Sequence, residues 1–502
     1  MTAIGFDTEK YLAEQSKQIM ARVSGKEKLY IEFGGKLISD KHAARVLPGF
    51  DENAKIRLLE ELKDQTEVII CVYAGDIEQN KIRGDYGITY DQEVMRLIDE
   101  YRERGIEVNS VLLTRYRDEK NAQVFVKNLE NRDIKVYIHR EIEGYPTDIE
   151  IMFSNEGFAK NPFIPTHRPL VVVTGPGAGS GKLATCLSQM YHEYKRGISA
   201  GYAKFETFPV WNLPLRHPVN IAYEASTVDL KDTNVLDNYH YEAYGEVAVN
   251  YNRDVKIFPI VKKIIEMISG ETSIYQSPTD MGVNCIKEGI TDNEVVEKAA
   301  NQEIIRRYFF EEVSYLEGTI DDETRSRMHM IMEENNLKPE DRAAVIPARE
   351  YAAELQKKKE AEYVQSVVAI ELPDGKIITG RRSRLMDASA ACIMNSLKYL
   401  AGIGDRIDLL APTILETIQR LKAVELHSKV PTLALNELLI ALAISAVTNP
   451  TADLAYKELK NLKGGQAHST VILSMENSLS LKRLGIDVTS DTYYLDNQMY
   501  NP

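Results

Sequence analysis

A glycine-rich segment that ends in a lysine is the part of this sequence whose residues most clearly suggest chemistry. It reads Thr174-Gly-Pro-Gly-Ala-Gly-Ser-Gly-Lys182 and lies between a valine run and a stretch with helical periodicity over 183–194. Glycines let the backbone approach a ligand, and the first N–H groups of a helix have no partner within it, so an anion can bind there. We therefore predict a phosphate-binding loop formed by Gly175, Gly177, Gly179, Ser180, Gly181 and Lys182.

This segment departs from the standard P-loop at two positions. Counted back from the final lysine, the first glycine of the motif falls on Pro176, and the Ser or Thr that should follow the lysine is Leu183. That hydroxyl normally binds Mg²⁺, so the segment supports phosphate binding more than Mg-nucleotide chemistry. A nucleotide is the cofactor class that such a loop would suit, and the use of Mg²⁺ stays open. The alternative interpretation is a glycine-rich turn that packs a helix onto a sheet.

A polar and aromatic region after this loop has weak apolar periodicity and is dense in His, Asn, Tyr, Arg and carboxylates. Such a composition suits a substrate pocket built from loops, and a solvated surface is the alternative. Two other segments carry cations, Gly34-Gly-Lys36 after a predicted strand and Gly380-Arg-Arg-Ser-Arg384 before a predicted helix. The candidate substrate-binding residues are Lys36, His217, Asn220, Tyr223, Asn252, Arg253, Arg381 and Arg384.

If the ligand is a polyphosphate with Mg²⁺, the metal needs oxygen ligands other than the missing hydroxyl. Thr185 is a poor substitute for the missing hydroxyl. It lies two residues after Leu183, which is a rotation of about 200° around the helix axis, so its side chain points well away from the motif position. The candidate metal ligands are Glu206, Glu224 and Asp229. The competing interpretation is that these acids are solvated or paired with Arg216 and Arg253, and that no metal is used.

The elements that must position these residues alternate between strands and helices. We predict strands over 28–33, 67–73, 108–114, 134–138 and 171–173, with helical periodicity between them. This alternation indicates an α/β fold with a doubly wound, mainly parallel sheet that carries the P-loop-like phosphate loop. Ligands of such sheets bind beyond the carboxyl ends of the strands, so the loops near Gly34, Ala74, Thr114 and Gly175 are expected to share one crevice.

The character of the chain changes twice after the polar region. Charged helices follow, and from residue 365 two predicted strands, 366–372 and 376–379, flank the turn Pro373-Asp-Gly375. A strand over 471–473 and a helix over 476–484 are predicted near the end. We therefore expect a P-loop-like α/β domain over 1–260, a mainly helical region and connector over 261–364, and a separate C-terminal α/β domain over 365–502.

Composition limits the class of protein. The 502 residues are 44% hydrophobic and 27% charged, which is typical of a globular chain with several domains. A formal charge of −14 argues against a general nucleic-acid binder. The first residues lack the basic and apolar regions of a signal peptide, and the longest apolar run, 438–447, is too short to span a bilayer.

Cysteine usage agrees with an intracellular setting. The four cysteines, Cys71, Cys186, Cys285 and Cys392, have neither metal-ligand spacing nor a disulfide pattern, so we expect buried reduced thiols.

The glycine-rich loop, the charge and the apolar runs together lead us to expect a cytoplasmic protein that binds a small phosphorylated ligand and neither nucleic acid nor membrane. We also expect it to form a homo-oligomer.

Several short segments together resemble a known bacterial family. They are Tyr30-Ile-Glu-Phe-Gly-Gly-Lys36, Leu47-Pro-Gly49, the loop from Gly175 to Lys182, His217-Pro-Val-Asn220, Glu242-Ala-Tyr-Gly245 and Val249-Asn-Tyr-Asn-Arg-Asp254. The family is domain-of-unknown-function family eighteen forty-six, also called uncharacterised protein family three seventy-one, and the resemblance runs end to end. It implies an α/β N-terminal part, a helical middle and a distinct C-terminal α/β subdomain, and it implies no established activity.

The residues themselves favour an enzyme, a phosphotransferase or hydrolase, that binds a phosphorylated small molecule or nucleotide through the glycine-rich loop. The alternative is a non-catalytic metabolite-binding or assembly protein. The sequence identifies neither the substrate nor the catalytic residues.

Overall fold

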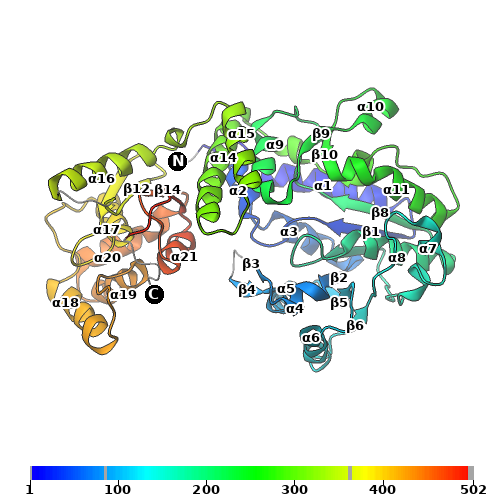
Figure 1. The fold of residues 1–502 in the computed structure, drawn as a ribbon, viewed down its shortest axis with the longest axis horizontal. Coiled ribbons are helices and arrows are strands. Elements are labelled where there is room, and N and C mark those ends of the chain that lie inside the picture. The colour runs from blue at the N-terminus through cyan, green and yellow to red at the C-terminus, as the bar shows by residue number, and fades with distance from the viewer. Residues whose placement is uncertain (1–2, 84–86, 360–363, 496–502) are drawn as a thin grey trace. The chain divides into compact units, whose positions relative to one another are not determined.

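The computed structural model describes residues 3–83, 87–359 and 364–495, and the chain divides into two compact units (Figure 1). The larger unit comprises residues 4–224 and 232–300, and the smaller unit comprises residues 1–3, 225–231 and 301–502. The units divide near residue 300, and the domain boundaries expected at 260 and 364 stay predictions. The second of those expected boundaries borders residues 360–363, which lie outside the described residues.

A seven-stranded sheet forms the centre of the larger unit. Its order is β11-β8-β1-β7-β2-β5-β6, and every neighbouring pair is parallel. The strands are β1 (Lys28–Phe33), β2 (Thr66–Tyr73), β5 (Glu107–Thr114), β6 (Val136–Ile138), β7 (Leu170–Thr174), β8 (Ala200–Phe205) and β11 (Gly282–Val283). The predicted α/β fold with a mainly parallel sheet is therefore confirmed.

The central strands β7 and β2 are largely apolar because both faces of the sheet are covered. All five residues of β7 are buried, as are seven of the eight residues of β2. Parallel strands buried on both faces appear in the sequence as continuous runs of Val and Ile, which is why these strands were predictable.

Helices cover the two faces of this sheet. One face carries Tyr30, Val171 and Tyr202 and packs against α8 (Lys182–Lys195) and α11 (Asn252–Ser269). Successive side chains of a strand point to opposite faces, so Thr174, three positions after Val171, faces the other side of the sheet. Thr174 lies beside Tyr101 of α5 (Tyr90–Glu103), so α5 covers that other face. The other elements of this unit are α1 (Thr8–Val23), α2 (Lys41–Val46), α3 (Ala54–Glu61), α4 (Ala74–Glu78), β3 (Ile82–Arg83), β4 (Ile88–Thr89), α6 (Lys120–Glu130), α7 (Ile149–Phe153), α9 (Pro218–Ser226), β9 (Asn234–Leu236), α10 (Asn238–Tyr244), β10 (Val249–Tyr251), α12 (Pro278–Met281) and α13 (Ile286–Gly289).

The strand order places two loops side by side at the carboxyl edge of the sheet. The connection from β1 to β2 skips the position that β7 fills and runs toward the β6 edge of the sheet. The later connection from β7 to β8 skips β1 and runs the opposite way, toward the β11 edge. The carboxyl ends of β1 and β7 are therefore neighbours at a point where their connections diverge. Such switch points are where open α/β sheets bind their ligands.

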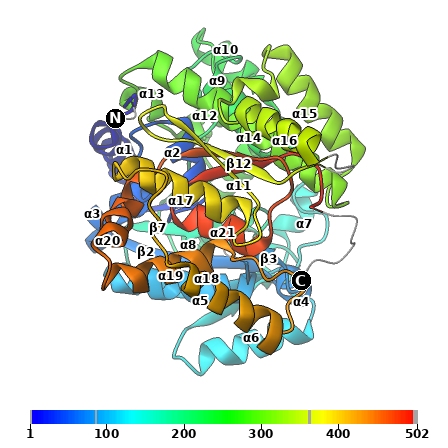
Figure 2. The ribbon, with the colours of Figure 1, turned by 90° about the vertical axis from the view of Figure 1, so that its left-hand side faces the viewer.

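The smaller unit has its own four-stranded sheet, in the order β13-β12-β14-β15. Its strands are β12 (Val367–Glu371), β13 (Ile377–Arg381), β14 (Gln466–Ser469) and β15 (Asp487–Ser490). Val367 and Ala369 pack against α16 (Val345–Lys359), whereas Val368 and Ile370 face a core that includes α17 (Ala388–Leu400). Figure 2 shows α16 and α17 on opposite sides of β12. The remaining helices are α14 (Asn293–Leu316), which begins in the larger unit, α15 (Asp322–Glu334), α18 (Pro412–Arg420), α19 (Leu435–Ala446), α20 (Pro450–Lys457) and α21 (Met475–Arg483).

The predicted hairpin around Pro373 is confirmed, and the predicted strand over 471–473 is wrong. Gly375 takes a φ of 83° in the turn between β12 and β13. The strand near the end of the chain is instead β14, whose polar residues pair through the main chain with β12 and β15. The apolar run at 471–473 follows that strand, because main-chain pairing and not side-chain hydrophobicity selects the residues of β14.

Candidate functional site

The Gly175–Lys182 loop connects β7 to α8, in the predicted order of strand, loop and helix. Gly181 is the N-cap of α8 with a φ of 92°, and no side chain caps this helix end. A Cβ atom at Gly175 would lie 2.3 Å from the carbonyl oxygen of Cys71. The conformation at Gly181 and the close packing at Gly175 explain why both positions are glycine.

The polar side chains of the loop bond to the loop itself. Lys182 Nζ donates to the carbonyl oxygen of Gly177 and to Ser180 Oγ, at 3.3 Å each, and Ser180 Oγ donates to Gly177 at 2.9 Å. Leu183 packs against the apolar core, and Thr185 Oγ1 donates to the Gly181 carbonyl oxygen at 2.9 Å. Phosphate binding by this loop stays a prediction.

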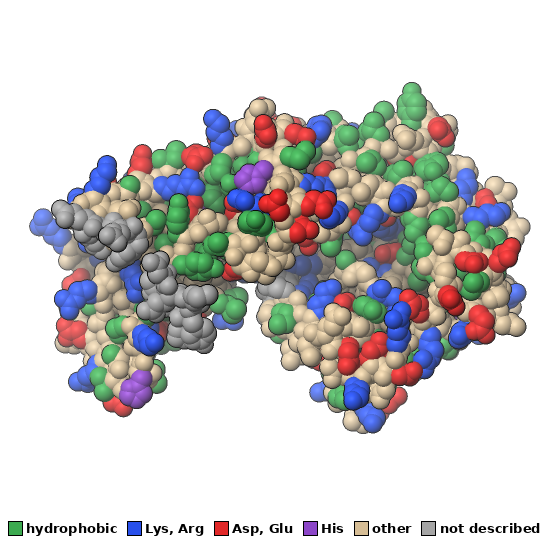
Figure 3. Space-filling view, in the orientation of Figure 1, with side chains coloured by type: hydrophobic (Ala, Val, Ile, Leu, Met, Phe, Trp, Pro, Cys, Tyr) green, Lys and Arg blue, Asp and Glu red, His purple; other side chains and the backbone are tan. Residues whose placement is uncertain are grey.

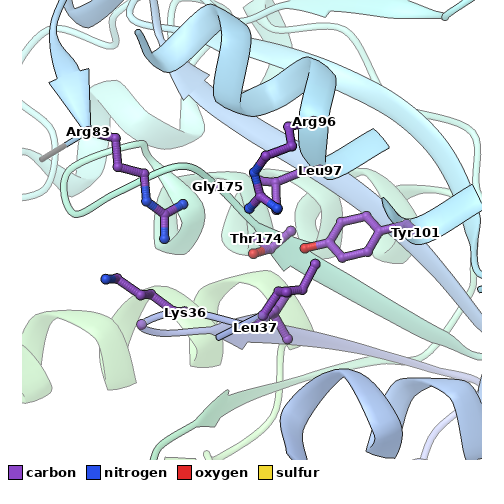
Figure 4. A pocket seen from close by; sticks show the side chains of 10 residues that line it. Lys36, Leu37, Arg83, Arg96, Leu97, Tyr101, Thr174 and Gly175 are labelled. Carbon is purple, nitrogen blue, oxygen red and sulfur yellow. The ribbon is translucent and has the colours of Figure 1, made fainter. Parts of the chain in front are cut away.

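A pocket lies beside the loop at the carboxyl ends of β1 and β7, and we call it the edge pocket. Its polar lining consists of Lys36, Arg83, Arg96, Tyr101, Thr174 and Gly175, and its apolar lining includes Leu37, Ile38 and Leu97. Figure 4 shows Lys36 and Arg83 at one end of the pocket and Tyr101 at the other, with Arg96 and Thr174 between them. The space between the lining atoms is about 240 Å³ and includes open solvent, so the edge pocket is a partly open recess and not an enclosed cavity.

The two arginines of the edge pocket are held by one buried carboxylate. Glu93 is completely buried, and its carboxylate oxygens lie 2.8 Å from Arg96 Nε and 2.8 Å from Arg96 Nη2. Arg83 Nη1 contacts the same carboxylate, and Arg96 also lies 3.4 Å from Glu100. Glu93 therefore positions both guanidinium groups at the pocket.

A second polar group, the Lys204 cluster, lies at the carboxyl ends of β1 and β8. Its members are Lys204, Glu206, Asp254 and Glu32. Lys204 Nζ lies 2.9 Å from Glu206 Oε1 and also contacts Asp254, while Tyr202 Oη donates to Glu32 at 3.1 Å. Burial raises the pKa of Glu206 to about 7, against the effect of Lys204 and with that of Asp254. Glu206 can therefore exchange a proton near neutral pH.

The Lys204 cluster and the Gly175–Lys182 loop are electrostatic neighbours. Burial raises the pKa of the Cys71 thiol to about 12, and the charge of Lys182 lowers it while the charge of Glu32 raises it. The same two charges act in the same directions on the buried thiol of Cys186. Lys182 and Glu32 thus approach one pair of thiols. All four cysteines are free and buried, as expected.

Of the predicted substrate-binding residues in the larger unit, Lys36 lines the edge pocket, while His217 and Asn220 have buried structural contacts. His217 Nε2 lies 3.0 Å from Asn293 Oδ1. Asn220 is completely buried, and its amide group bonds to the main chain of Val210 and Pro214.

Three other predicted residues lie around or near the Lys204 cluster. The Tyr223 ring stacks on Phe208 with ring centroids 5.6 Å apart, and burial raises the pKa of Tyr223 to about 12. Asn252 begins α11, where its Oδ1 accepts from the Arg253 amide at 2.8 Å. Arg253 itself pairs with the Asp232 carboxylate at 2.6 Å. Arg381 and Arg384 belong to the smaller unit, where both are exposed.

The three predicted metal ligands do not gather in one place. Glu206 bonds to Lys204, Glu224 accepts from the Asn234 amide at 3.3 Å, and Asp229 belongs to the smaller unit. Within the described part of the chain, the one group of three carboxylate or imidazole side chains with ligand atoms within 4.8 Å of one another is Glu67, Glu107 and His167. Glu67 there already accepts from the amides of His167 and Arg168 and from Asn109, so both of its carboxylate oxygens are engaged by protein donors.

Sequence reasoning missed Arg83, Arg96, Tyr101 and Lys204. Arg96 and Tyr101 lie on α5, one of the periodic segments between the predicted strands, and periodicity alone does not single out the residues of a helix that reach a site. The spacing of Glu93, Arg96 and Glu100 at i, i+3 and i+7 indicates an ion-pair ladder on one helix face. The sequence does contain one indication of Lys204. It precedes Glu206 by two positions, so in an extended strand the two side chains point to the same side.

Acidic and basic side chains are interspersed on the molecular face that Figure 3 shows. This face therefore does not present one large patch of a single charge sign. Among the described helices, none combines the length and the apolar character that a membrane crossing would need.

Comparison with known proteins places the chain in one family. The model of the N-terminal domain of the family "Domain of unknown function DUF1846" matches residues 4–336, and that of its C-terminal domain matches residues 340–500. Proteins called "UPF0371 protein" from Clostridium botulinum (strain Langeland / NCTC 10281 / Type F) and Clostridium tetani (strain Massachusetts / E88) are each 59% identical over 497 residues, which is 99% of both chains. A relative from Clostridium botulinum (strain Alaska E43 / Type E3) is 58% identical over the same length. With both domain models matched and full-length relatives at this identity, the chain belongs to the DUF1846 family, as its sequence motifs indicated.

Proposed function

We propose that this chain is an enzyme that acts on a phosphorylated small molecule, nucleotides being one class, bound by the Gly175–Lys182 loop. The main support is the position of a proton-exchanging cluster next to an uncapped helix end at the carboxyl edge of a parallel sheet. The loop offers amides and the Lys182 ammonium group to a phosphate, and the Lys204 cluster offers an acid–base group within the same region.

Glu206 is the acid–base group that this proposal requires. Its pKa of about 7 is close to the value at which a carboxyl both donates and accepts protons at neutral pH. Phosphotransfer and hydrolysis can both use such a group at the attacking or leaving oxygen. Because the Lys204 ammonium group lies 2.9 Å from Glu206, that carboxylate is a poor partner for Mg²⁺.

The first experiment measures ligand binding. Nucleotides, sugar phosphates and pyrophosphate are screened by thermal shift, where a ligand at 100 times its Kd stabilises the protein by about 2.7 kcal/mol. Lys182→Ala is expected to leave Tm nearly unchanged and to weaken binding, whereas the exposed Lys127→Ala on α6 serves as a matched control. Undiminished binding by a folded Lys182→Ala protein removes the loop from the site.

A parallel calorimetric titration addresses the metal. The ligand is titrated with and without Mg²⁺ into the wild type, Glu206→Gln and Glu224→Gln. Metal-independent binding that neither substitution changes eliminates the metal-site hypothesis.

The second candidate function is a non-catalytic metabolite-binding or assembly protein. It is favoured by the hydrogen bonds of Lys182, which donates to its own loop. The two functions are separated by following a bound ligand by phosphorus NMR. Turnover that Glu206→Gln abolishes without weakening binding supports an enzyme, and an unchanged ligand supports the second candidate.

A further inference from the structure

The edge pocket contains a buried hydroxyl group that lacks a partner. Tyr101 is completely buried on α5, and its Oη approaches the Thr174 side chain without forming a hydrogen bond of normal geometry among the described residues. Burial raises the pKa of Tyr101, so the hydroxyl is a neutral donor. Buried hydroxyl groups almost always have an acceptor, so a hydroxyl that also lines a pocket is available to an acceptor bound there.

Three cations line the same pocket from three different elements. Lys36 follows β1, Arg83 belongs to β3, and Arg96 lies on α5 (Figure 4). Glu93 holds both arginines in place, so their approach to the pocket does not depend on a ligand. A preorganised set of positive charges and one hydroxyl donor is suited to an anion.

We propose that the edge pocket binds a tetrahedral oxyanion, the phosphoryl group of a phosphate monoester, with Tyr101 as a neutral donor and Lys36, Arg83 and Arg96 as charged partners. A planar carboxylate is satisfied by one arginine in a bidentate pair, whereas a phosphoryl group presents three oxygens to donors from several directions. The pocket is partly open to solvent, so the rest of such a molecule can lie outside it.

This site goes beyond the function proposed above, because its side-chain donors are not those of the Gly175–Lys182 loop. The subsite stands whether or not the loop binds a ligand. Only Gly175 belongs to both.

The test uses inorganic phosphate and a pair of matched tyrosine variants of the full chain. Tyr11 on α1 is also completely buried with a hydroxyl that has no partner among the described residues, and it does not line the pocket. Tyr101→Phe and Tyr11→Phe therefore each remove one buried hydroxyl group, and only Tyr101 lines the edge pocket. Phosphate is titrated by calorimetry into the wild type, both variants and Lys36→Gln.

We expect the wild type to bind phosphate, Tyr101→Phe to weaken the affinity about tenfold, and Tyr11→Phe to leave it unchanged. Lys36→Gln should weaken it further and reduce its salt dependence. Equal affinities of the two tyrosine variants, or a wild type that takes up no phosphate, would overturn the proposal. Acetate is the second arm, and tighter binding of acetate than of phosphate would overturn the assigned ligand class.

Lys182→Ala separates this site from the proposed loop site. A variant that loses binding of the larger phosphorylated ligands and still binds inorganic phosphate supports two distinct subsites. Loss of phosphate binding in Lys182→Ala with no effect of Tyr101→Phe would overturn the edge pocket and support the loop alone.

Discussion

Lys204 and Glu206 come from the end of one strand, and Lys204 Nζ lies 2.9 Å from Glu206 Oε1, with Asp254 of α11 in contact with the same ammonium group. The groups that act on Glu206 are Lys204, Asp254 and Glu32, with Arg22, Tyr223 and Tyr251 also within electrostatic range. Burial prevails among these effects and raises the pKa of Glu206 to about 7 from an ordinary value of 4.5.

The first prediction concerns the pH dependence of stability. Since the folded state binds the Glu206 proton more tightly than the unfolded state, this group stabilises the fold below about pH 4.5 and loses that contribution as the pH rises through about 7. Glu206→Gln removes the titration. We expect the free energy of unfolding of the wild type to fall relative to that of the variant by ~2 kcal/mol between about pH 5 and 8. Urea denaturation across this range measures it, and parallel pH profiles would refute it.

The second prediction concerns His139, which is buried with Nε2 3.0 Å from the Pro162 carbonyl oxygen. Burial lowers its pKa to about 4 from 6.5. Its contribution to stability is therefore present above about pH 6.5 and is lost as the pH falls through about 4. His139→Gln should flatten the acid limb of the stability profile by ~2 kcal/mol. An acid limb as steep as that of the wild type would count against this assignment.

The third prediction separates two glycines of the loop. A Cβ atom at Gly175 would lie 2.3 Å from Cys71 O and 2.5 Å from Ser180 Oγ, whereas a Cβ atom at Gly179 would meet nothing within 4 Å. Gly175→Ala should lower the free energy of unfolding by ~3 kcal/mol through steric overlap. Gly179→Ala, at a φ of 73°, should cost only about 1 kcal/mol of left-handed backbone strain. Equal losses in chemical denaturation would contradict the packing described for the loop.

The fourth prediction concerns Asn220, whose side chain is bonded to the main chain of Val210 and Pro214. Asn220→Ala leaves buried main-chain groups without partners and should cost ~2–3 kcal/mol of stability. Asn128→Ala, on the exposed face of α6, is the control and should change stability by less than about 0.5 kcal/mol. If Asn220→Ala instead keeps its stability and loses ligand affinity, Asn220 belongs to the binding site as the sequence suggested.

Much of the secondary structure was predictable because burial on two faces leaves a direct mark on composition. The valine run of β7 and the apolar run of β2 were recognised for this reason, and so was the Pro373-Asp-Gly375 turn, whose glycine takes a positive φ. The strand over 471–473 failed because β14 is chosen by main-chain pairing, and its Gln466 and His468 carry no apolar pattern.

The sequence by itself determined the alternation of strands and helices, the position of the glycine loop between β7 and α8, and membership of the DUF1846 family. Only the tertiary structure decided which side chains meet. The order in which β7 inserts between β1 and β2 brings Lys36 to Thr174, and the packing of α5 brings Tyr101 and Arg96 to the same edge. Local periodicity reports which face of an element is buried, but it contains no information on which distant element covers that face, and that pairing is what builds the edge pocket and the Lys204 cluster.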